Sequence, residues 1–219
     1  HLFPDVLNPA ALDLVKLAAL IAMFVDHANT LFLARPEPLL YAFGRMAFPL
    51  FTLIWAMNVQ RTPERLQKRA NRLWVWAFIT QPVFFLAFQH HQPWYALNIL
   101  FVFAGVTQLL AWIKRYGKKG MFYGGTILLV SLPLLTPASY GLQGLVLAIS
   151  LAIWLSPECS RENMLPEALI MVALITLNGF SHIITQPADT LLFAVLPTVL
   201  LPLATISLTR NLSSKSSAR

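Results

Sequence analysis

Long apolar stretches separated by short polar segments run through the whole chain. Each is near the length of about 20 residues that a helix needs to cross the hydrocarbon core of a bilayer. The third and fifth stretches are short, and Pro82 and Pro133 within them are expected kink positions. The pattern predicts an all-α, polytopic membrane helix bundle with about eight transmembrane helices. Their expected ranges are 11–33, 39–58, 73–89, 96–113, 121–135, 140–157, 166–185 and 189–208.

The first stretch carries ionisable residues inside an otherwise apolar helix. From Leu17 to Val25 no polar residue interrupts it, so it lacks the polar face of a soluble amphipathic helix. Asp26 and His27 follow at membrane depth, where ionisable side chains are costly and mostly face the bundle interior. Lys16 precedes His27 by eleven residues, which on an ideal helix puts both on one face about 16.5 Å apart. This face would present a cation at the membrane surface and an imidazole deep inside.

Composition agrees with a membrane protein. The 219 residues are 57% hydrophobic and 11% charged, with a mean hydropathy of +0.64, whereas soluble domains carry about 25% charged residues. The net charge of +7 reflects topology, because basic residues gather in the loops of one side. By the positive-inside rule both termini are expected to be cytosolic, and no nucleic-acid partner is expected. The basic side holds Arg61, Arg65, Lys68, Arg69, Arg72, Lys114, Arg115, Lys118, Lys119, Arg161, Arg210, Lys215 and Arg219, and the other side Arg35.

We expect one transmembrane domain over residues 1–210 and a polar C-terminal tail over 211–219. The chain begins at His1, which suggests a trimmed form, and we expect no signal peptide. The single Cys159 offers no thiol pair for a disulfide, for redox chemistry or for a metal.

The expected topology also brings two opposite charges together. The first two helices run antiparallel across a short turn, and counting from their outer ends puts Asp26 and Arg45 at similar depth. A buried Asp–Arg pair makes both charges tolerable inside a membrane. His27 points about 100° away from Asp26 around the helix, so it need not share that pair.

Five segments, in this order, carry a resemblance to a known family. They are VDHAN (25–29), FGRMAFPLF (43–51), NRLWVWAF (71–78), PWYALNILFVF (93–103) and YGLQGL (140–145). Together they resemble the TraX family of conjugative pilin acetylases, over most of the chain up to about Leu155. The resemblance implies a multi-pass enzyme of the bacterial inner membrane that acetylates the amino terminus of a pilin subunit with acetyl-CoA.

Lys16 and His27 also look like the basic-x10-His signature of the wider integral-membrane acyltransferases. There the basic residue is associated with the cofactor and the histidine with acyl transfer. At the C-terminus the likeness departs, since family members usually finish with a further helix bearing a Tyr and a His, whereas this chain ends in SSKSSAR.

His27, Asp26 and Arg45 are the candidate catalytic residues. Imidazole exchanges a proton near neutral pH, so His27 suits a general base, and the alternative is a packing histidine bonded to a carbonyl. Arg45 could bond the thioester carbonyl or the developing oxyanion, with Asp26 orienting it. The alternative for Asp26 and Arg45 is a structural salt bridge, and the two roles are compatible.

The run RTPERLQKRANR at 61–72 holds five cations and one acid beside the cytosolic face. Its Arg65, Arg69 and Arg72, with Lys16, are candidate ligands for the phosphates of CoA. The alternative is a topogenic loop that touches anionic lipid, and Lys16 could instead snorkel toward head groups.

Asn98 and Tyr140 are the candidate substrate-binding residues, both in segments shared with the TraX family. Polar residues within apolar spans, which include Gln81, Asn178 and His182, more often make hydrogen bonds between helices. No metal site is expected, because the adjacent His90 and His91 lack a third ligand.

The leading function is therefore a membrane acetyltransferase with acetyl-CoA as co-substrate, a pilin as acceptor and the bilayer as its environment. One alternative is a small proton-coupled transporter in which Asp26, His27 and Arg45 form a relay. It lacks the internal repeat of many secondary transporters. The other alternative is a purely structural assembly subunit.

Overall fold

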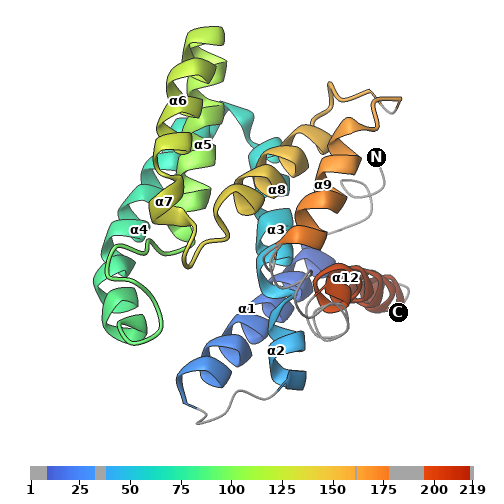
Figure 1. Cartoon of the computed structure of the whole chain (residues 1–219). Helices are drawn as coiled ribbons and strands as arrows, with labels where there is room; N and C mark the ends of the chain where they lie inside the picture. Colours follow the sequence, from blue (N-terminus) through green and yellow to red (C-terminus); the bar gives the residue numbers. More distant parts are fainter. Residues whose placement is uncertain (1–8, 33–37, 161, 178–194, 218–219) are drawn as a thin grey trace.

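The computed structural model describes residues 9–32, 38–160, 162–177 and 195–217. These residues form helices joined by turns, with no strand among them (Figure 1), which confirms the all-helical class. The number of membrane spans and the side of the termini stay predictions. The helices are α1 Pro9–Leu31, α2 Pro38–Gly44, α3 Ala47–Arg61, η1 Pro63–Arg65, α4 Leu66–Phe88, α5 Leu100–Tyr116, α6 Lys118–Val130, α7 Leu132–Leu135, α8 Gly141–Trp154, α9 Leu165–Thr176 and α12 Leu196–Ser217.

The stretch 39–58, expected as one helix, is divided at Arg45. α2 ends at Gly44 and α3 begins at Ala47. Pro49 accounts for the break, because it has no N–H to donate to the carbonyl of Arg45 and its ring would clash with that carbonyl in a continuous helix. Arg45 therefore lies in the turn between two helices.

Prolines act differently in the two short stretches. Pro133 lies at the start of α7, and the expected span 121–135 is divided there into α6 and α7. Pro82 lies inside α4, which continues past it to Phe88. α4 also begins earlier than expected, at Leu66, so most of the basic run is helical and not a loop.

α3 occupies the middle of the fold. It packs against α1, α8 and α5, while α4, α5 and α6 lie side by side on one flank and α12 packs on α1 (Figure 1). Leu50 of α3, Val102 of α5 and Leu147 of α8 are fully buried. α3 therefore links the two parts of the molecule that carry the candidate site residues.

Large apolar side chains also cover much of the outer surface. Trp76 and Phe78 of α4 and Phe122 of α6 are more than half exposed. Soluble monomers rarely expose large contiguous apolar patches. By length and hydropathy the stretch Ala42–Arg61 suffices to cross a membrane, and Gly141–Trp154 and Leu165–Thr176 are shorter apolar helices. The described part of the chain is thus compatible with a membrane protein.

Candidate functional site

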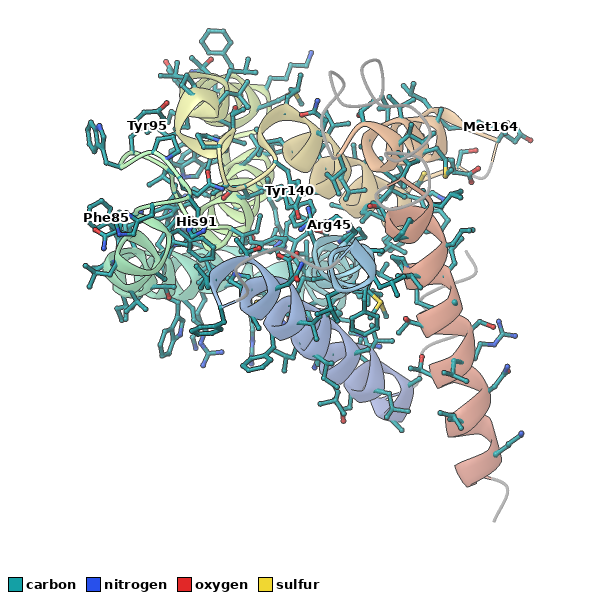
Figure 2. All side chains as sticks on the ribbon, turned by 60° about the horizontal axis from the view of Figure 1, so that its bottom comes forward. Arg45, Phe85, His91, Tyr95, Tyr140 and Met164 are labelled. Carbon is teal, nitrogen blue, oxygen red and sulfur yellow. The ribbon has the colours of Figure 1, made fainter. Side chains whose placement is uncertain are left out.

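The expected contact between Asp26 and Arg45 is present in the structure. Nη2 of Arg45 donates a hydrogen bond of 2.6 Å to Oδ1 of Asp26, which joins α1 to the turn between α2 and α3. The Arg45 and Asp26 side chains are 13% and 22% exposed, and Figure 2 labels Arg45 near the middle of the view. Because water is largely excluded, loss of either partner would leave a poorly compensated charge.

Gly44 allows this contact by bringing α2 close to α1. A Cβ atom at position 44 would lie 2.6 Å from Cβ and 2.8 Å from Oδ1 of Asp26. Carbon atoms do not approach this closely without a shift, and the atoms concerned are near the backbone of α1. Gly44 is therefore required for the spacing between Asp26 and Arg45.

We expect Gly44→Ala to lower the free energy of unfolding by about 1–3 kcal/mol, because overpacking forces the two helices apart. Thermal unfolding of the detergent-solubilised chain would measure it. Gly125→Ala in α6 is the matched control, since a Cβ there meets nothing within 4 Å. That change should stabilise the helix by about 0.5–1 kcal/mol. An equal shift for both variants would contradict the close approach.

The ring of His27 makes a hydrogen bond within its own helix. Its Nδ1 lies 2.7 Å from the carbonyl oxygen of Met23, one turn earlier on α1. A carbonyl only accepts, so Nδ1 is the donor, and when the ring is neutral the lone pair is on Nε2. The half-buried ring meets the ring of Phe88 edge-on, with centroids 5.3 Å apart. Nε2 is therefore the nitrogen that can accept a proton.

The predicted cofactor residues of the basic run lie together at a cavity between α3, α4 and α5, which we call the basic cavity. Its volume is about 590 Å³, within the range of about 300–1,000 Å³ found for small-molecule sites. None of the described residues that line it is acidic. Its cationic rim consists of Arg65, Lys68, Arg69 and Arg72.

The interior of the basic cavity is apolar and aromatic. Phe51, Trp55, Leu100 and Phe103 line it below the rim. Nε1 of Trp55 donates a hydrogen bond of 2.8 Å to Oγ1 of Thr107, which ties α3 to α5 across the wall. The cavity therefore offers positive charge at one end and an apolar enclosure at the other.

Two hydrogen bonds hold the rim in place. Nε of Arg69 donates to Oγ1 of Thr62 over 2.7 Å, and Nζ of Lys114 donates to the carbonyl oxygen of Pro63 over 2.8 Å. Both anchor the turn η1 between α3 and α4. The Arg69 guanidinium is thus oriented before any ligand binds.

Lys16 lies apart from the basic cavity. Its Nζ is 3.9 Å from Oδ1 of Asp13 on the same helix, and its side chain is 45% exposed. It does not line the cavity, and neither do Asp26, His27 and Arg45. The shared helix face of Lys16 and His27 therefore does not by itself form one site, and the role of Lys16 in cofactor binding stays a prediction.

An aromatic contact lies between Arg45 and the basic cavity. Phe48, one turn after Arg45, stacks on Tyr140 with centroids 4.5 Å apart and leans on Phe103 of the cavity wall at 6.0 Å. We call Phe48, Phe103 and Tyr140 the aromatic layer. Tyr140 is half-buried, and Figure 2 labels it close to Arg45 near the middle of the view.

The YGLQGL segment places Tyr140 in this layer. Tyr140 has φ of 64° and Gly141 has φ of 53°, a left-handed turn that for Tyr140 carries a strain of about 1–2 kcal/mol. A Cβ at Gly144 would approach Cζ of Phe48 to 3.4 Å and Cβ of Tyr140 to 3.1 Å. The two glycines therefore allow the turn and the close packing, while substrate binding by Tyr140 stays a prediction.

Asn98 uses its side chain within the bundle. Nδ2 donates to the carbonyl oxygen of Ala77 at 3.1 Å and to Oε1 of Gln81 at 2.9 Å, and Oδ1 accepts from the backbone N–H of Leu100 at 3.0 Å. Nε2 of Gln81 donates in turn to the carbonyl oxygen of Ala96. These are the interhelical bonds expected as the alternative for such residues, and substrate binding by Asn98 stays a prediction. Asn178 and His182 lie outside the described residues.

Lys68 and Asn58 also line the basic cavity, although neither was among the residues predicted to bind CoA. The signal for Lys68 is spacing, because positions 65, 68, 69 and 72 recur as i, i+3, i+4 and i+7 and so share one helix face. Asn58 has no such signal beyond being polar within an apolar span.

Comparison with known proteins assigns a family to this arrangement. Residues 11–218 match the family described as TraX protein. Two relatives, both named Protein TraX, are 38% identical (Escherichia coli) and 36% identical (Escherichia coli strain K12) over 168 residues. Each alignment covers 75% of this chain and 65% of the relative, so the chain spans about 65% of their length. No solved structure matches the chain. Because the family match extends over nearly all of its residues, the chain belongs to the TraX family.

Proposed function

We propose that the chain is an integral-membrane acetyltransferase that moves an acetyl group from acetyl-CoA to the N-terminal amine of a pilin. The basic cavity carries the proposal, because its charge and shape suit an anionic donor with a less polar arm. The pilin acceptor follows from the resemblance to TraX pilin acetylases. The same resemblance supports a role of the chain in conjugation. The exposed apolar surface of α4 and α6 supports a multi-pass protein of the bacterial inner membrane.

In this proposal the rim arginines bind the phosphates of the donor. A guanidinium presents two parallel N–H groups to a phosphate and remains charged at any physiological pH. Nε of Arg69 is already bonded to Thr62, so its two Nη groups serve the ligand. Arg65 and Arg72 line the same cavity and complete the cationic set.

The arm of the donor then extends inward between α3 and α5. From Val59 to Phe51 the cavity follows α3 over eight residue steps, a rise of about 12 Å. It ends at Phe51, Leu100 and Phe103, so the thioester comes to lie against the aromatic layer. The acetyl group thus approaches the middle of the bundle.

His27 and Arg45 carry the chemical step. Nε2 of His27 accepts a proton from the acceptor amine, whose nitrogen attacks the thioester carbonyl carbon and forms the new C–N bond. Arg45, held by Asp26, donates hydrogen bonds to the carbonyl oxygen as it becomes an oxyanion. The C–S bond then breaks, and the thiolate of CoA takes the proton from His27. The products are the acetylated pilin and CoA with a free thiol.

This sequence of events requires the aromatic layer to open. Phe48 lies one turn from Arg45 and packs on both Phe103 and Tyr140, so the donor thioester and Arg45 meet only if Phe48 moves. The strained turn at Tyr140 is the natural place for that movement, because strained backbone is often found where a structure switches.

We expect Arg69→Gln to raise the KM for acetyl-CoA about ten- to a hundredfold, because it removes a charged hydrogen-bond donor from the rim. The kcat should change little, since Arg69 lies far from the acyl group. Arg115→Gln is the matched control, because Arg115 lies over the ring of Tyr116 and does not line the basic cavity. Equal effects of the two substitutions on KM would contradict phosphate binding at the rim.

The proposal as a whole is tested by the intact mass of a pilin co-expressed with this chain. A mass increase of one acetyl group, absent when the chain is omitted, is the expected result. A pilin that stays unmodified while the chain drives solute flux across proteoliposomes would overturn the proposal in favour of a transporter.

A further inference from the structure

Asn58 contributes a polar side chain to the wall of the basic cavity. It lies on α3 one turn below Thr62, whose hydroxyl holds Arg69 at the rim and also donates to the backbone carbonyl of Asn58. One turn is a rise of about 5.4 Å. Trp55 follows three residues deeper, where the wall becomes apolar. Asn58 therefore lies between the cationic rim and the apolar interior.

The side-chain amide of Asn58 differs from the amides around it. Gln60 on the same helix donates to the carbonyl oxygen of Ala152, and Gln67 and Gln108 bond to each other between α4 and α5. Within the described part of the chain the Asn58 side chain has no hydrogen-bond partner, and it is only half-buried. Amides inside a bundle are normally paired, so one left facing a cavity is available to a ligand.

We propose that Asn58 binds the amide-containing arm of the donor, between its phosphates and its acyl group. This inference rests on the proposed function, in which the donor is an acyl-CoA. An asparagine side chain both donates and accepts, and so it matches a secondary amide, which has one N–H and one carbonyl.

The order of groups along the cavity supports this assignment. From the rim inward the wall presents cations, then the Asn58 amide, then Trp55 and Phe51. An acyl-pantetheine donor presents phosphates, then amides, then a short acyl group in the same order. An anionic glycerophospholipid presents a phosphate and then ester-linked hydrocarbon, which offers no N–H to Asn58.

Two ligands distinguish binding of the phosphorylated nucleotide from binding of the amide-containing arm. CoA carries both parts, whereas adenosine 3′-phosphate 5′-diphosphate carries the nucleotide without the arm. We expect Asn58→Leu, measured by calorimetry on the full detergent-solubilised chain, to weaken CoA binding about tenfold, since one or two hydrogen bonds are lost. Binding of the nucleotide should stay within about twofold of the unaltered protein, which also shows that the variant is folded.

Asn71→Leu is the matched control, because Asn71 is an exposed amide on α4 that bonds to Gln67 and does not line the cavity. It should leave the affinities for both ligands unchanged. Unaltered CoA binding by Asn58→Leu, or equal weakening of both ligands, would overturn the role of Asn58 while leaving the donor site in place. Failure of the unaltered protein to bind either ligand would instead remove the proposed donor, and the inference with it.

Discussion

Replacing His27 with alanine is expected to abolish acetylation of the pilin while the protein stays folded. A general base contributes about 10²–10⁴-fold to a rate, so the rate of acetyl transfer should fall at least about a hundredfold. The structural cost should be small, because alanine is the best helix former and the ring of His27 is only half-buried. The measurement is the intact mass of the pilin at timed intervals, with CoA binding measured in parallel.

Two further variants separate the catalytic role of His27 from its packing. His27→Gln keeps a donor for the carbonyl of Met23 but has no nitrogen that accepts a proton, so it should be as inactive as His27→Ala. His91→Ala changes an exposed histidine beyond the end of α4 (Figure 2) and should leave acetylation unchanged. Full acetylation by the His27→Gln protein would exclude His27 as the base.

The contact between Asp26 and Arg45 was predictable from sequence, because it depends only on how far each residue lies from the outer end of its helix. Two antiparallel helices with a short connection bring residues at equal distance from their outer ends together, whatever the details of packing. The break of the helix at Arg45 was also encoded, since Pro49 removes the hydrogen bond to that carbonyl. The need for glycine at position 44 was not visible, because it depends on how closely α2 approaches α1.

The basic cavity could not be predicted from the sequence alone. The helical spacing of Arg65, Arg69 and Arg72 gives their common face, but only the structure shows that this face covers a cavity between α3 and α5. Lys16 illustrates the opposite case. The spacing of eleven residues from His27 holds along α1, yet none of the described residues of α1 lines the basic cavity, which lies between α3, α4 and α5. The spacing of residues along one helix shows which of them share a face, but not which other helices pack against that face.

Arg45→Lys should separate the charge of Arg45 from its geometry. Lysine keeps the positive charge beside Asp26, so the free energy of unfolding should fall by less than the roughly 3–5 kcal/mol that loss of the charge costs in such a pair. It loses the planar fork of N–H groups, and the rate of acetyl transfer should fall about 10²–10³-fold if Arg45 stabilises the oxyanion. Thermal unfolding and pilin mass, measured on the same preparation, give the two quantities.

The neutral variants of the pair provide the control for Arg45→Lys. Arg45→Gln leaves Asp26 without its cation in a largely shielded place, and breaking such a buried pair reduces stability by about 3–5 kcal/mol. Adding Asp26→Asn should restore part of this loss, because the unpaired charge is then gone, and a double-mutant cycle measures the interaction. If the double variant regains stability but still does not acetylate the pilin, the pair has a role in the reaction besides joining α1 to the turn before α3. An Arg45→Lys protein that acetylates at the full rate would instead reduce Arg45 to a structural ion-pair partner of Asp26.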